Sequence, residues 1–531
     1  KKINWTVPLL NNGDSVSPDG RLYVYLDRLS QSLYSLDLSS GKVINLTEKL
    51  FIPKIDTSFD GSKAERGELN GGITWLSDRD VLVNDKYDIW LIEASGKVPP
   101  VNLTNGFGRK HNITFEKADY NQFIPKSKLL LLKGIDNKTK DQYFFKINLS
   151  NRIDPELLSK GGYAYDLKLE PGEHPLISHR TKEYIVQIQN GVISPNYYMT
   201  NDFRIFKRLT DVQSEQAYNW LTNDLVDYRL PTGYPLQAII YKPENFDPAK
   251  KYPVIITYYE KLTQHKNEYQ LPGLMFGEIN IPWMVSRGYV VVTPDIHYQI
   301  GFPLKSAFNC VMAAANYIKK LSFVDSNKIG IMGHSWGGFE TNYIVTHTNM
   351  FAAAFSSCGS ADMIANYGSL TKSGSSLQYM SEVFQTRIGA TLWNRPDLYI
   401  ENSSIFQADK VTAPVLLMNN KIDGIVPFSQ GVEFFTALRR LGKKVWMLQY
   451  DGQDHNLLDK QAQYDYTIRT QQFFDHYLKG LPAPVWMTRG IPASLKGTTD
   501  GFEYDKEIKT PPPSPLIDPN KDPKIIYDYN N

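Results

Sequence analysis

Hydrophobic positions in residues 1–225 fall in short clusters of aromatic and β-branched residues. Turn sequences such as Ser17-Pro18-Asp19-Gly20 and Ser39-Ser40-Gly41 separate these clusters, which is the pattern of short strands joined by tight turns. No long helical period appears among them. The pattern therefore predicts an all-β region over residues 1–225.

A degenerate repeat runs through this region. In each copy an aromatic strand residue is followed 11 to 13 residues later by a Leu-Thr-like pair, and successive pairs lie 57, 54 and 52 residues apart. A period of this length suits one four-stranded blade of a β-propeller, so about four blades are expected, with a non-repeating β-sandwich as the alternative. The copies are Tyr34 with Leu46-Thr47, Trp90 with Leu103-Thr104, Phe145 with Leu157-Leu158, and Tyr198 with Leu209-Thr210.

The pattern changes over residues 226–489, where apolar strands alternate with helical stretches. This alternation is typical of βαβ units and predicts an α/β domain with a mainly parallel sheet. A helix is expected over Lys305–Leu321. Residues 490–531, rich in Pro, Asp and Lys, are expected to form an extended surface tail. The predicted strands are Val254–Tyr258, Val290–Thr293, Ile329–Met332, Val415–Met418 and Val445–Leu448.

Composition narrows the classes of function. With 58 basic and 56 acidic side chains and no block of either sign, the chain lacks the charge signature of a nucleic-acid-binding protein. Cys310 and Cys358 are too few for a disulfide framework and match no metal-ligand spacing, so both are expected to be buried. No apolar run reaches the ~18 residues of a membrane-spanning helix.

The N-terminal sequence is relevant to the cellular compartment of the protein. The sequence starts at Lys1 without an initiator Met or a signal-like apolar stretch, so a preceding segment is expected. We expect a periplasmic or extracellular protein, with the cytoplasm as the alternative. Whether it forms a homodimer or associates with another protein stays open at this point.

The strongest local motif is Gly333-His334-Ser335-Trp336-Gly337-Gly338, directly after a predicted strand and before a helical run. A serine hydroxyl is a poor nucleophile unless a sharp strand-to-helix turn presents it to a base, and that turn leaves no room for side chains at 333 and 337. The backbone N–H of Trp336 would point at a developing oxyanion. The motif predicts an α/β-hydrolase nucleophile, with a capping serine in a glycine-rich turn as the alternative.

Such a nucleophile needs an acid and a histidine later in the chain, each in a loop after a strand. Three histidines follow Ser335; His347 and His476 fall on predicted helices, whereas His455 follows the strand that begins at Val445. Asp423 follows the strand Val415–Met418 and could orient the imidazole. We therefore expect Ser335 as nucleophile, His455 as general base and Asp423 as its orienting acid. Asp451, Asp454 and Asp459 are expected to be solvated loop charges.

These residues resemble the prolyl oligopeptidase family of serine peptidases, which includes dipeptidyl peptidases and acylaminoacyl peptidases. The resemblance rests on the Gly333–Gly338 motif, on Asp423-Gly424-Ile425-Val426-Pro427 and on Asp454-His455. It implies an N-terminal β-propeller, incomplete here because four repeats are fewer than the seven or eight blades typical of the family. Lys251–Tyr259 resembles the strand whose final tyrosine donates to the oxyanion, which would give that role to Tyr259.

Two loops depart from the family pattern. Glu260-Lys261-Leu262 stands where small residues and Gly-Pro are usual, and His297-Tyr298-Gln299 stands where a glycine-rich turn is common. Both loops border the expected site, which suggests a divergent, bacterial-looking subgroup. Trp336 and Val426, next to the nucleophile and the acid, would line the pocket for the residue before the scissile bond.

The expected function is hydrolysis of short peptides through an acyl-enzyme, with access limited by the propeller and without a metal or organic cofactor. Two alternatives remain: an esterase acting on small non-peptide esters, since triad chemistry does not choose its acyl group, and a non-enzymatic protein whose propeller mediates assembly.

Overall fold

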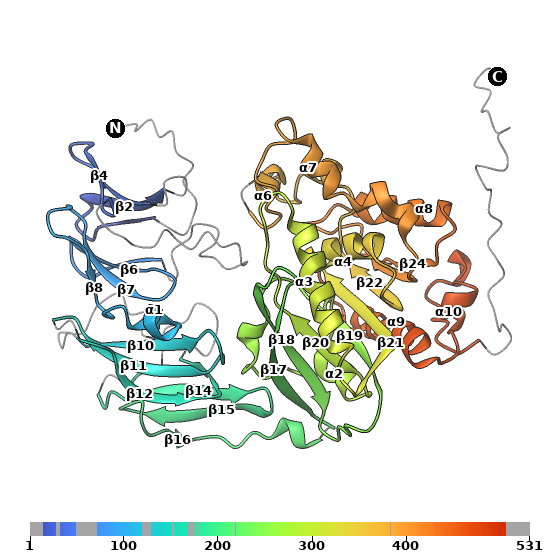
Figure 1. Ribbon diagram of the computed structural model, residues 1–531, viewed down its shortest axis with the longest axis horizontal. Helices are drawn as coiled ribbons and strands as arrows, with labels where there is room; N and C mark the ends of the chain where they lie inside the picture. Colours follow the sequence, from blue (N-terminus) through green and yellow to red (C-terminus); the bar gives the residue numbers. More distant parts are fainter. Residues whose placement is uncertain are drawn as a thin grey trace.

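The computed structural model describes residues 14–27, 32–48, 72–118, 129–150, 153–167, 176–178, 180–217, 219–382 and 384–505. Two parts lie side by side: four small sheets stacked in chain order and a larger α/β domain (Figure 1). The pattern change expected near residue 226 thus corresponds to a change of architecture, because the eight-stranded sheet of the α/β domain starts with β17 at Leu221.

Each small sheet consists of four antiparallel strands paired in chain order. The first contains β1 (Asp14–Val16), β2 (Leu22–Asp27), β3 (Ser32–Asp37) and β4 (Val43–Asn45). The second contains β5 (Ile73–Trp75), β6 (Asp80–Asn84), β7 (Ile89–Glu93) and β8 (Val101–Asn102). The third contains β9 (Ile113–Lys117), β10 (Leu129–Asp136), β11 (Gln142–Asn148) and β12 (Glu156–Gly161), preceded by α1 (Phe107–His111). The fourth contains β13 (Ala164–Asp166), β14 (Tyr184–Asn190), β15 (Ile193–Thr200) and β16 (Lys207–Arg208).

The Leu-Thr repeat has a structural cause. In three of the four sheets the threonine hydroxyl accepts the backbone N–H of the third strand, just before or beside the aromatic residue, and so joins the end of the fourth strand to the third. The third sheet has Leu158 in place of threonine, and the pairing of β11 with β12 is irregular between Phe144 and Phe145. The three bonds are Leu33 N to Thr47 Oγ1 (3.0 Å), Ile89 N to Thr104 Oγ1 (3.2 Å) and Tyr197 N to Thr210 Oγ1 (2.9 Å).

Hydrophobic side chains fill the space between successive sheets. Val24 of the first sheet packs in one cluster with Val81 of the second. Leu82, on the opposite face of the same strand as Val81, belongs to the next cluster with Phe115 of the third sheet. Because alternate side chains of a strand point to opposite faces, each inner sheet contributes to two cores. The stacking follows from this alternation.

The α/β domain is built on an eight-stranded sheet of order β17-β18-β20-β19-β21-β22-β23-β24. The first two strands pair antiparallel, and strands β19 to β24 are parallel. This order and direction are those of an α/β-hydrolase sheet. The strands are β17 (Leu221–Arg229), β18 (Pro235–Pro243), β19 (Tyr252–Thr257), β20 (Val290–Pro294), β21 (Val324–His334), β22 (Ala353–Ser357), β23 (Val415–Met418) and β24 (Val445–Leu448).

Helices cover both faces of this sheet. One apolar cluster joins α3, α4 and α8 to one face, and a second joins α2, α9 and α10 to the other. The helices are α2 (Ile281–Val285), α3 (Pro303–Ile318), α4 (Trp336–His347), α5 (Met363–Tyr367), α6 (Gln378–Glu382), α7 (Pro396–Glu401), α8 (Phe428–Arg440), α9 (Lys460–Lys479) and α10 (Val485–Thr488), with short 3₁₀ turns at Ser214–Ala217, Thr263–His265, Ser404–Lys410 and Ala493–Leu495. None of the described helices combines the length and apolarity needed to cross a membrane.

Polar contacts join the two parts on the side of β18 and the loop after β19. Asn267 Nδ2 donates to Lys140 O at 2.8 Å, and Gln237 Nε2 donates to Lys138 O at 2.9 Å. In the fourth sheet, Gln189 Oε1 accepts the backbone N–H of Tyr269 at 3.0 Å. Backbone and side-chain hydrogen bonds therefore fix the loop that follows Tyr259 against the small sheets.

The C-terminal segment divides into two parts. Residues 490–505 pack on the α/β domain, where Arg489 pairs with the buried carboxylate of Asp505 at 3.0 Å and Arg469 lies between Trp486 and Phe502. The first part of the expected tail is therefore held on the α/β domain by an ion pair and a cation–π contact. The rest of the expected tail, residues 506–531, lies outside the described residues.

Candidate active site

Ser335 occupies a strained turn between β21 and α4. Its backbone has φ 55° and ψ −119°, a region that residues with a side chain rarely adopt. A Cβ at Gly333 would overlap the carbonyl of Gly337, and one at Gly337 would overlap the carbonyl of Tyr258. The two glycines are thus needed because backbone passes through the space that side chains would fill. The turn places Ser335 at the carboxyl end of the sheet.

His455 and Asp423 meet in the loops after β24 and β23. Asp423 Oδ2 lies 2.8 Å from His455 Nδ1, and the side chains are 1% and 10% exposed, respectively. The other carboxylate oxygen accepts the backbone N–H groups of Ile425 and Val426 at 2.8 and 2.9 Å. Asp423 is thereby held by its own loop with one oxygen aimed at the imidazole.

Ser335 lies close to this pair through its neighbours in the chain. The His334 ring packs on the His455 ring with centroids 4.9 Å apart. Ser335 N donates to Ser357 O at 2.8 Å, and the thiol of the next residue, Cys358, donates to His455 O at 3.3 Å. Among the described residues no hydrogen bond joins Ser335 Oγ to the imidazole, a bond that in enzymes often tightens only when substrate binds.

Asp454 joins the acid loop to the histidine loop. Its Oδ1 accepts the backbone N–H of Gly424 at 2.6 Å and that of His455 at 2.7 Å. Burial raises the pKa of Asp454, but these two bonds and Lys372 outweigh it, and the net pKa is lowered. The expectation of a merely solvated loop charge missed this contact, because the partners are backbone groups without a sequence signature.

Asp459 has a structural role of the same kind. Its carboxylate accepts the N–H groups of Gln461 and Ala462 at 3.0 and 2.9 Å and caps α9. Asp451 pairs with Lys496 on the surface, at 2.5 Å. Asp451 and Asp459 are both exposed, as expected, and Asp459 in addition caps a helix.

Tyr259 places its hydroxyl beside Ser335. Burial raises its pKa, and hydrogen bonding to Gln385 and Ser335 partly offsets that shift. Gln385 Nε2 donates to the hydroxyl at 2.9 Å. Tyr258, in contrast, is buried and bonds Thr341 of α4 at 2.8 Å. The structure therefore directs Tyr259, and not its neighbour, toward the nucleophile.

The predicted pocket residues are buried. Trp336 is 1% exposed and its indole N–H donates to Tyr298 Oη at 2.9 Å, while Val426 is 3% exposed. The backbone of Trp336 starts α4 next to Ser335. Their role in substrate binding stays a prediction.

Three potential metal ligands lie together at this site. Atoms of Cys358, Asp423 and His455 fall within 4.8 Å of one another. Burial raises the pKa of the Cys358 thiol well above 9.0, and this thiol donates to His455 O at 3.3 Å. Since His455 Nδ1 already bonds Asp423, the donor set fits a proton relay better than a metal centre.

The pKa of the buried His334 imidazole makes the stability of the protein depend on pH, and this dependence tests whether the site is buried. Burial, with the His455 ring acting in the same direction, lowers the pKa of His334 to about 3 from 6.5. Below about pH 6.5 the unfolded chain binds one more proton here than the folded chain, so this contribution to stability is complete above that pH and declines as pH falls. From this one group, the unfolding free energy is expected to fall by about 1.4 kcal/mol for each pH unit below the pKa of the unfolded chain.

We expect His334→Gln to reduce the loss of unfolding free energy between about pH 6.5 and about pH 4.5 relative to the parent protein, as measured by urea unfolding. Equal pH slopes in the two proteins would contradict the assigned burial.

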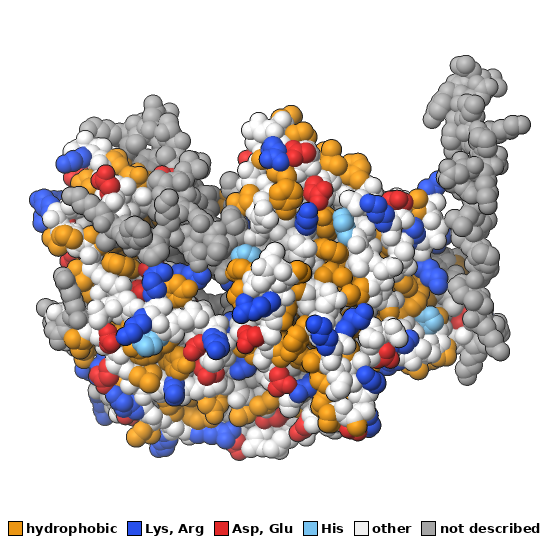
Figure 2. All heavy atoms as spheres, in the orientation of Figure 1, with side chains coloured by type: hydrophobic (Ala, Val, Ile, Leu, Met, Phe, Trp, Pro, Cys, Tyr) orange, Lys and Arg blue, Asp and Glu red, His pale blue; other side chains and the backbone are white. Residues whose placement is uncertain are grey.

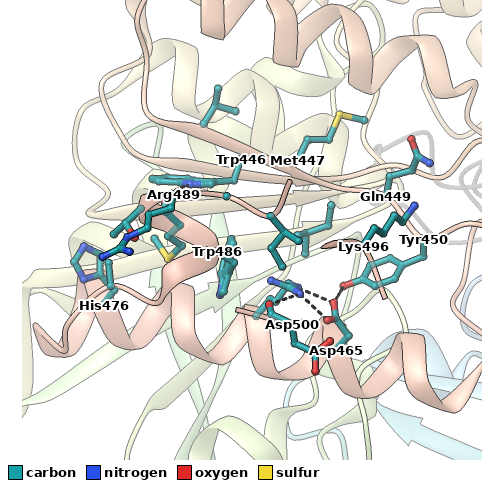
Figure 3. A pocket seen from close by; sticks show the side chains of 18 of the residues that line it. Trp446, Met447, Gln449, Tyr450, Asp465, His476, Trp486, Arg489, Lys496 and Asp500 are labelled. Carbon is teal, nitrogen blue, oxygen red and sulfur yellow. Dashed lines mark hydrogen bonds and ion pairs between the residues drawn. The ribbon is translucent and has the colours of Figure 1, made fainter. Parts of the chain in front are cut away.

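A further cavity lies outside this site. It has a volume of about 1940 Å³ and is lined by β24, α9, α10 and the segment 490–505. In Figure 3 Arg489, Trp486 and His476 line one side, while Tyr450 and Asp465 are joined by a hydrogen bond on the other. Asp465 also pairs with Arg469 at 2.7 Å. Two of the carboxylates that line the cavity, Asp465 and Asp505, are thus paired with Arg469 and Arg489.

The surface carries both signs of charge. On the face shown in Figure 2, Lys and Arg side chains alternate with Asp and Glu over both parts of the molecule, without a large patch of one sign.

Several known proteins are similar to this chain. A family model described as the prolyl oligopeptidase family matches residues 305–481. Dipeptidyl-peptidase 5 of Porphyromonas gingivalis is 23% identical over 494 residues, covering 84% of this chain and 64% of that protein. The uncharacterized peptidase YuxL of Bacillus subtilis is 23% identical over 346 residues, covering 61% of this chain and 48% of that protein. The chain thus spans about half to two thirds of the length of these curated relatives.

Solved structures extend the likeness to most of the chain. A puromycin-hydrolyzing peptidase of Mycobacterium tuberculosis superposes with a TM-score of 0.62 at 16% identity, covering 89% of this chain and 70% of that one. At this identity the likeness concerns the fold: an α/β-hydrolase domain with an N-terminal β-rich region. The match over residues 305–481 thus identifies a prolyl oligopeptidase family domain within the α/β part of the chain.

Proposed function

We propose that this chain is a serine peptidase that cleaves short peptides through an acyl-enzyme on Ser335. The observation that carries the proposal is the strained Ser335 turn at the same sheet edge as the hydrogen-bonded His455–Asp423 pair. Peptidase names among the relatives support the substrate class.

The proposed chemistry has two steps. His455 takes the Ser335 proton as Oγ attacks the peptide carbonyl, and then returns it to the leaving amine. Asp423 keeps the imidazole proton on Nδ1, so that Nε2 is free to act as base. Water then attacks the acyl-enzyme by the reverse proton path and releases the acyl product.

Tyr259 is proposed to donate to the oxyanion together with the N–H of Trp336. Tyr259→Phe removes one such donor, so we expect kcat to fall by about 10² to 10³-fold. Steady-state hydrolysis of a chromogenic peptide measures this effect. Tyr258→Phe, which changes the neighbouring hydroxyl bonded to Thr341, is the matched control and should leave kcat within about tenfold. Equal losses in both variants would argue against the assignment.

We also propose that the four stacked sheets are blades of a β-propeller that limits access to the site. Their four-stranded antiparallel form and their face-to-face packing in chain order support this. A propeller next to the catalytic domain would admit short peptides and exclude folded proteins.

A substrate panel tests the function. We expect turnover of short chromogenic peptides with an apolar or proline residue before the scissile bond, since Trp336 and Val426 are apolar. A clear preference for acidic or basic residues at that position would contradict the pocket, and hydrolysis of small esters without hydrolysis of peptides would indicate an esterase instead.

A further inference from the structure

We propose that Gln385 is a positioning residue that sets the direction of the Tyr259 hydroxyl, and that an ion pair between Glu260 and Arg387 holds it there. The inference rests on the proposed oxyanion role of Tyr259 and adds a requirement to it. It concerns the segment between α6 and α7, which the sequence alone did not connect with the site.

The direction of a hydroxyl depends on its partners. Gln385 Nε2 donates to Tyr259 Oη at 2.9 Å and so occupies a lone pair of the oxygen. An amide N–H cannot accept a hydrogen bond, so the Tyr259 proton must point to another group. Ser335 is the other hydrogen-bonding partner of this hydroxyl. Gln385 therefore directs the tyrosine proton to the place where the oxyanion forms.

Arg387 fixes the backbone of Gln385. One guanidinium nitrogen donates to Gln385 O, and another pairs with Glu260 Oε1 at 3.0 Å. The two side chains are 7% and 14% exposed, so water screens the pair little. The guanidinium also lies 4.2 Å from the centroid of the Tyr298 ring. Its partner Glu260 directly follows Tyr259. The ion pair therefore joins the segment that carries Gln385 to the loop after β19, next to Tyr259.

The backbone of Tyr259 is held from the other side by Tyr298. Tyr298 Oη lies 2.7 Å from Tyr259 O and 2.6 Å from Glu340 Oε1, two acceptors for one hydroxyl proton. The Tyr298 hydroxyl is thus shared as a donor between the Tyr259 carbonyl and Glu340, and burial raises the pKa of that carboxyl well above 4.5. Trp336 Nε1 donates to the same oxygen of Tyr298, at 2.9 Å.

This network gives the two unusual loops a common role. Glu260, where the family usually has small residues, supplies the carboxylate for Arg387. Tyr298, where a glycine-rich turn is common, contacts both Tyr259 and Trp336. The residues proposed to hold the oxyanion are thus supported by side chains that replace the backbone turns usual in the family.

Two substitutions at Gln385 separate positioning from packing. Gln385→Glu keeps the shape but replaces the donor with a carboxylate, which accepts the Tyr259 proton and turns it away from the oxyanion. We expect kcat at neutral pH to fall by about 10²-fold, close to the loss of a whole oxyanion donor. Gln385→Ala removes the bond without a competing acceptor, and we expect a fall of about 3 to 10-fold.

A purely structural role predicts the opposite order, because the isosteric variant would be tolerated and the truncation would leave a cavity. Activity of Gln385→Glu equal to that of the parent protein would overturn the proposal, since the amide would then present its oxygen to Tyr259. Gln378→Glu on α6 is the matched control; it adds the same charge to the same segment and should keep the parent kcat.

The same substitutions in a Tyr259→Phe background separate this inference from the oxyanion assignment. If Gln385 acts through the hydroxyl, its two substitutions should change kcat by less than about threefold in that background. If the Gln385 substitutions lower kcat as much in the Tyr259→Phe background as in the parent protein, the inference is refuted. If Tyr259→Phe alone retains the parent kcat, the oxyanion role itself fails.

Discussion

Replacing Ser335 with alanine is expected to lower peptide turnover by about 10⁴-fold or more, because no other group can form the acyl-enzyme. The residual rate would come from substrate binding and the oxyanion donors. Steady-state kinetics with a chromogenic peptide measures the loss, and circular dichroism checks that the fold is kept. Alanine has the same difficulty as serine with φ 55° at this position, so Ser335→Ala should not relieve the backbone strain.

Two further variants serve as controls for this prediction. Ser373→Ala changes an exposed serine near the acid loop and should keep the parent kcat. Ser335→Gly should be as inactive as Ser335→Ala but more stable by about 1 kcal/mol, since glycine adopts positive φ without strain. Near-normal peptidase activity in Ser335→Ala would show that the nucleophile has been misidentified.

The second large effect is expected at Asp423. In Asp423→Asn the side-chain oxygen can still accept the N–H groups of Ile425 and Val426, so the amide nitrogen must face His455 Nδ1. That nitrogen donates, which forces the imidazole proton onto Nε2 and removes the base from Ser335. We expect kcat to fall by about 10⁴-fold with little change in stability.

Asp454→Asn is the matched control for this change. Its remaining oxygen can still accept the N–H groups of Gly424 and His455, and only a partly exposed pair with Lys372 is lost. The variant should retain activity within about tenfold. Equal losses at Asp423 and Asp454 would mean that loop geometry, and not the imidazole tautomer, accounts for both.

Much of the α/β domain could be predicted from the sequence, because its strands are continuous apolar runs and its nucleophile turn has a fixed glycine pattern. Ser335, Asp423 and His455 follow β21, β23 and β24 as expected. Strand β22 was missed, since its Ala and Ser residues lack β-propensity and only burial between β21 and β23 defines it. The helix expected over Lys305–Leu321 starts at Pro303, whose ring suits a first helical position.

The contacts that support the site could not be predicted in the same way. Asp454, Gln385 and Arg387 act through backbone groups or through residues far away in sequence, such as Glu260 at a separation of 127 residues from Arg387. No local pattern records such a partner. The repeat in residues 1–225 was visible because each threonine bonds within its own sheet, so the interaction recurs at a fixed spacing.

The most direct test of the central claim is covalent labelling with a fluorophosphonate followed by peptide mapping. A single adduct on the peptide that carries Ser335, formed far more slowly in His455→Ala, is the expected result, because the probe needs an activated serine and its base. Labelling of another residue, or of Ser335 at the same rate without His455, would contradict the proposed mechanism.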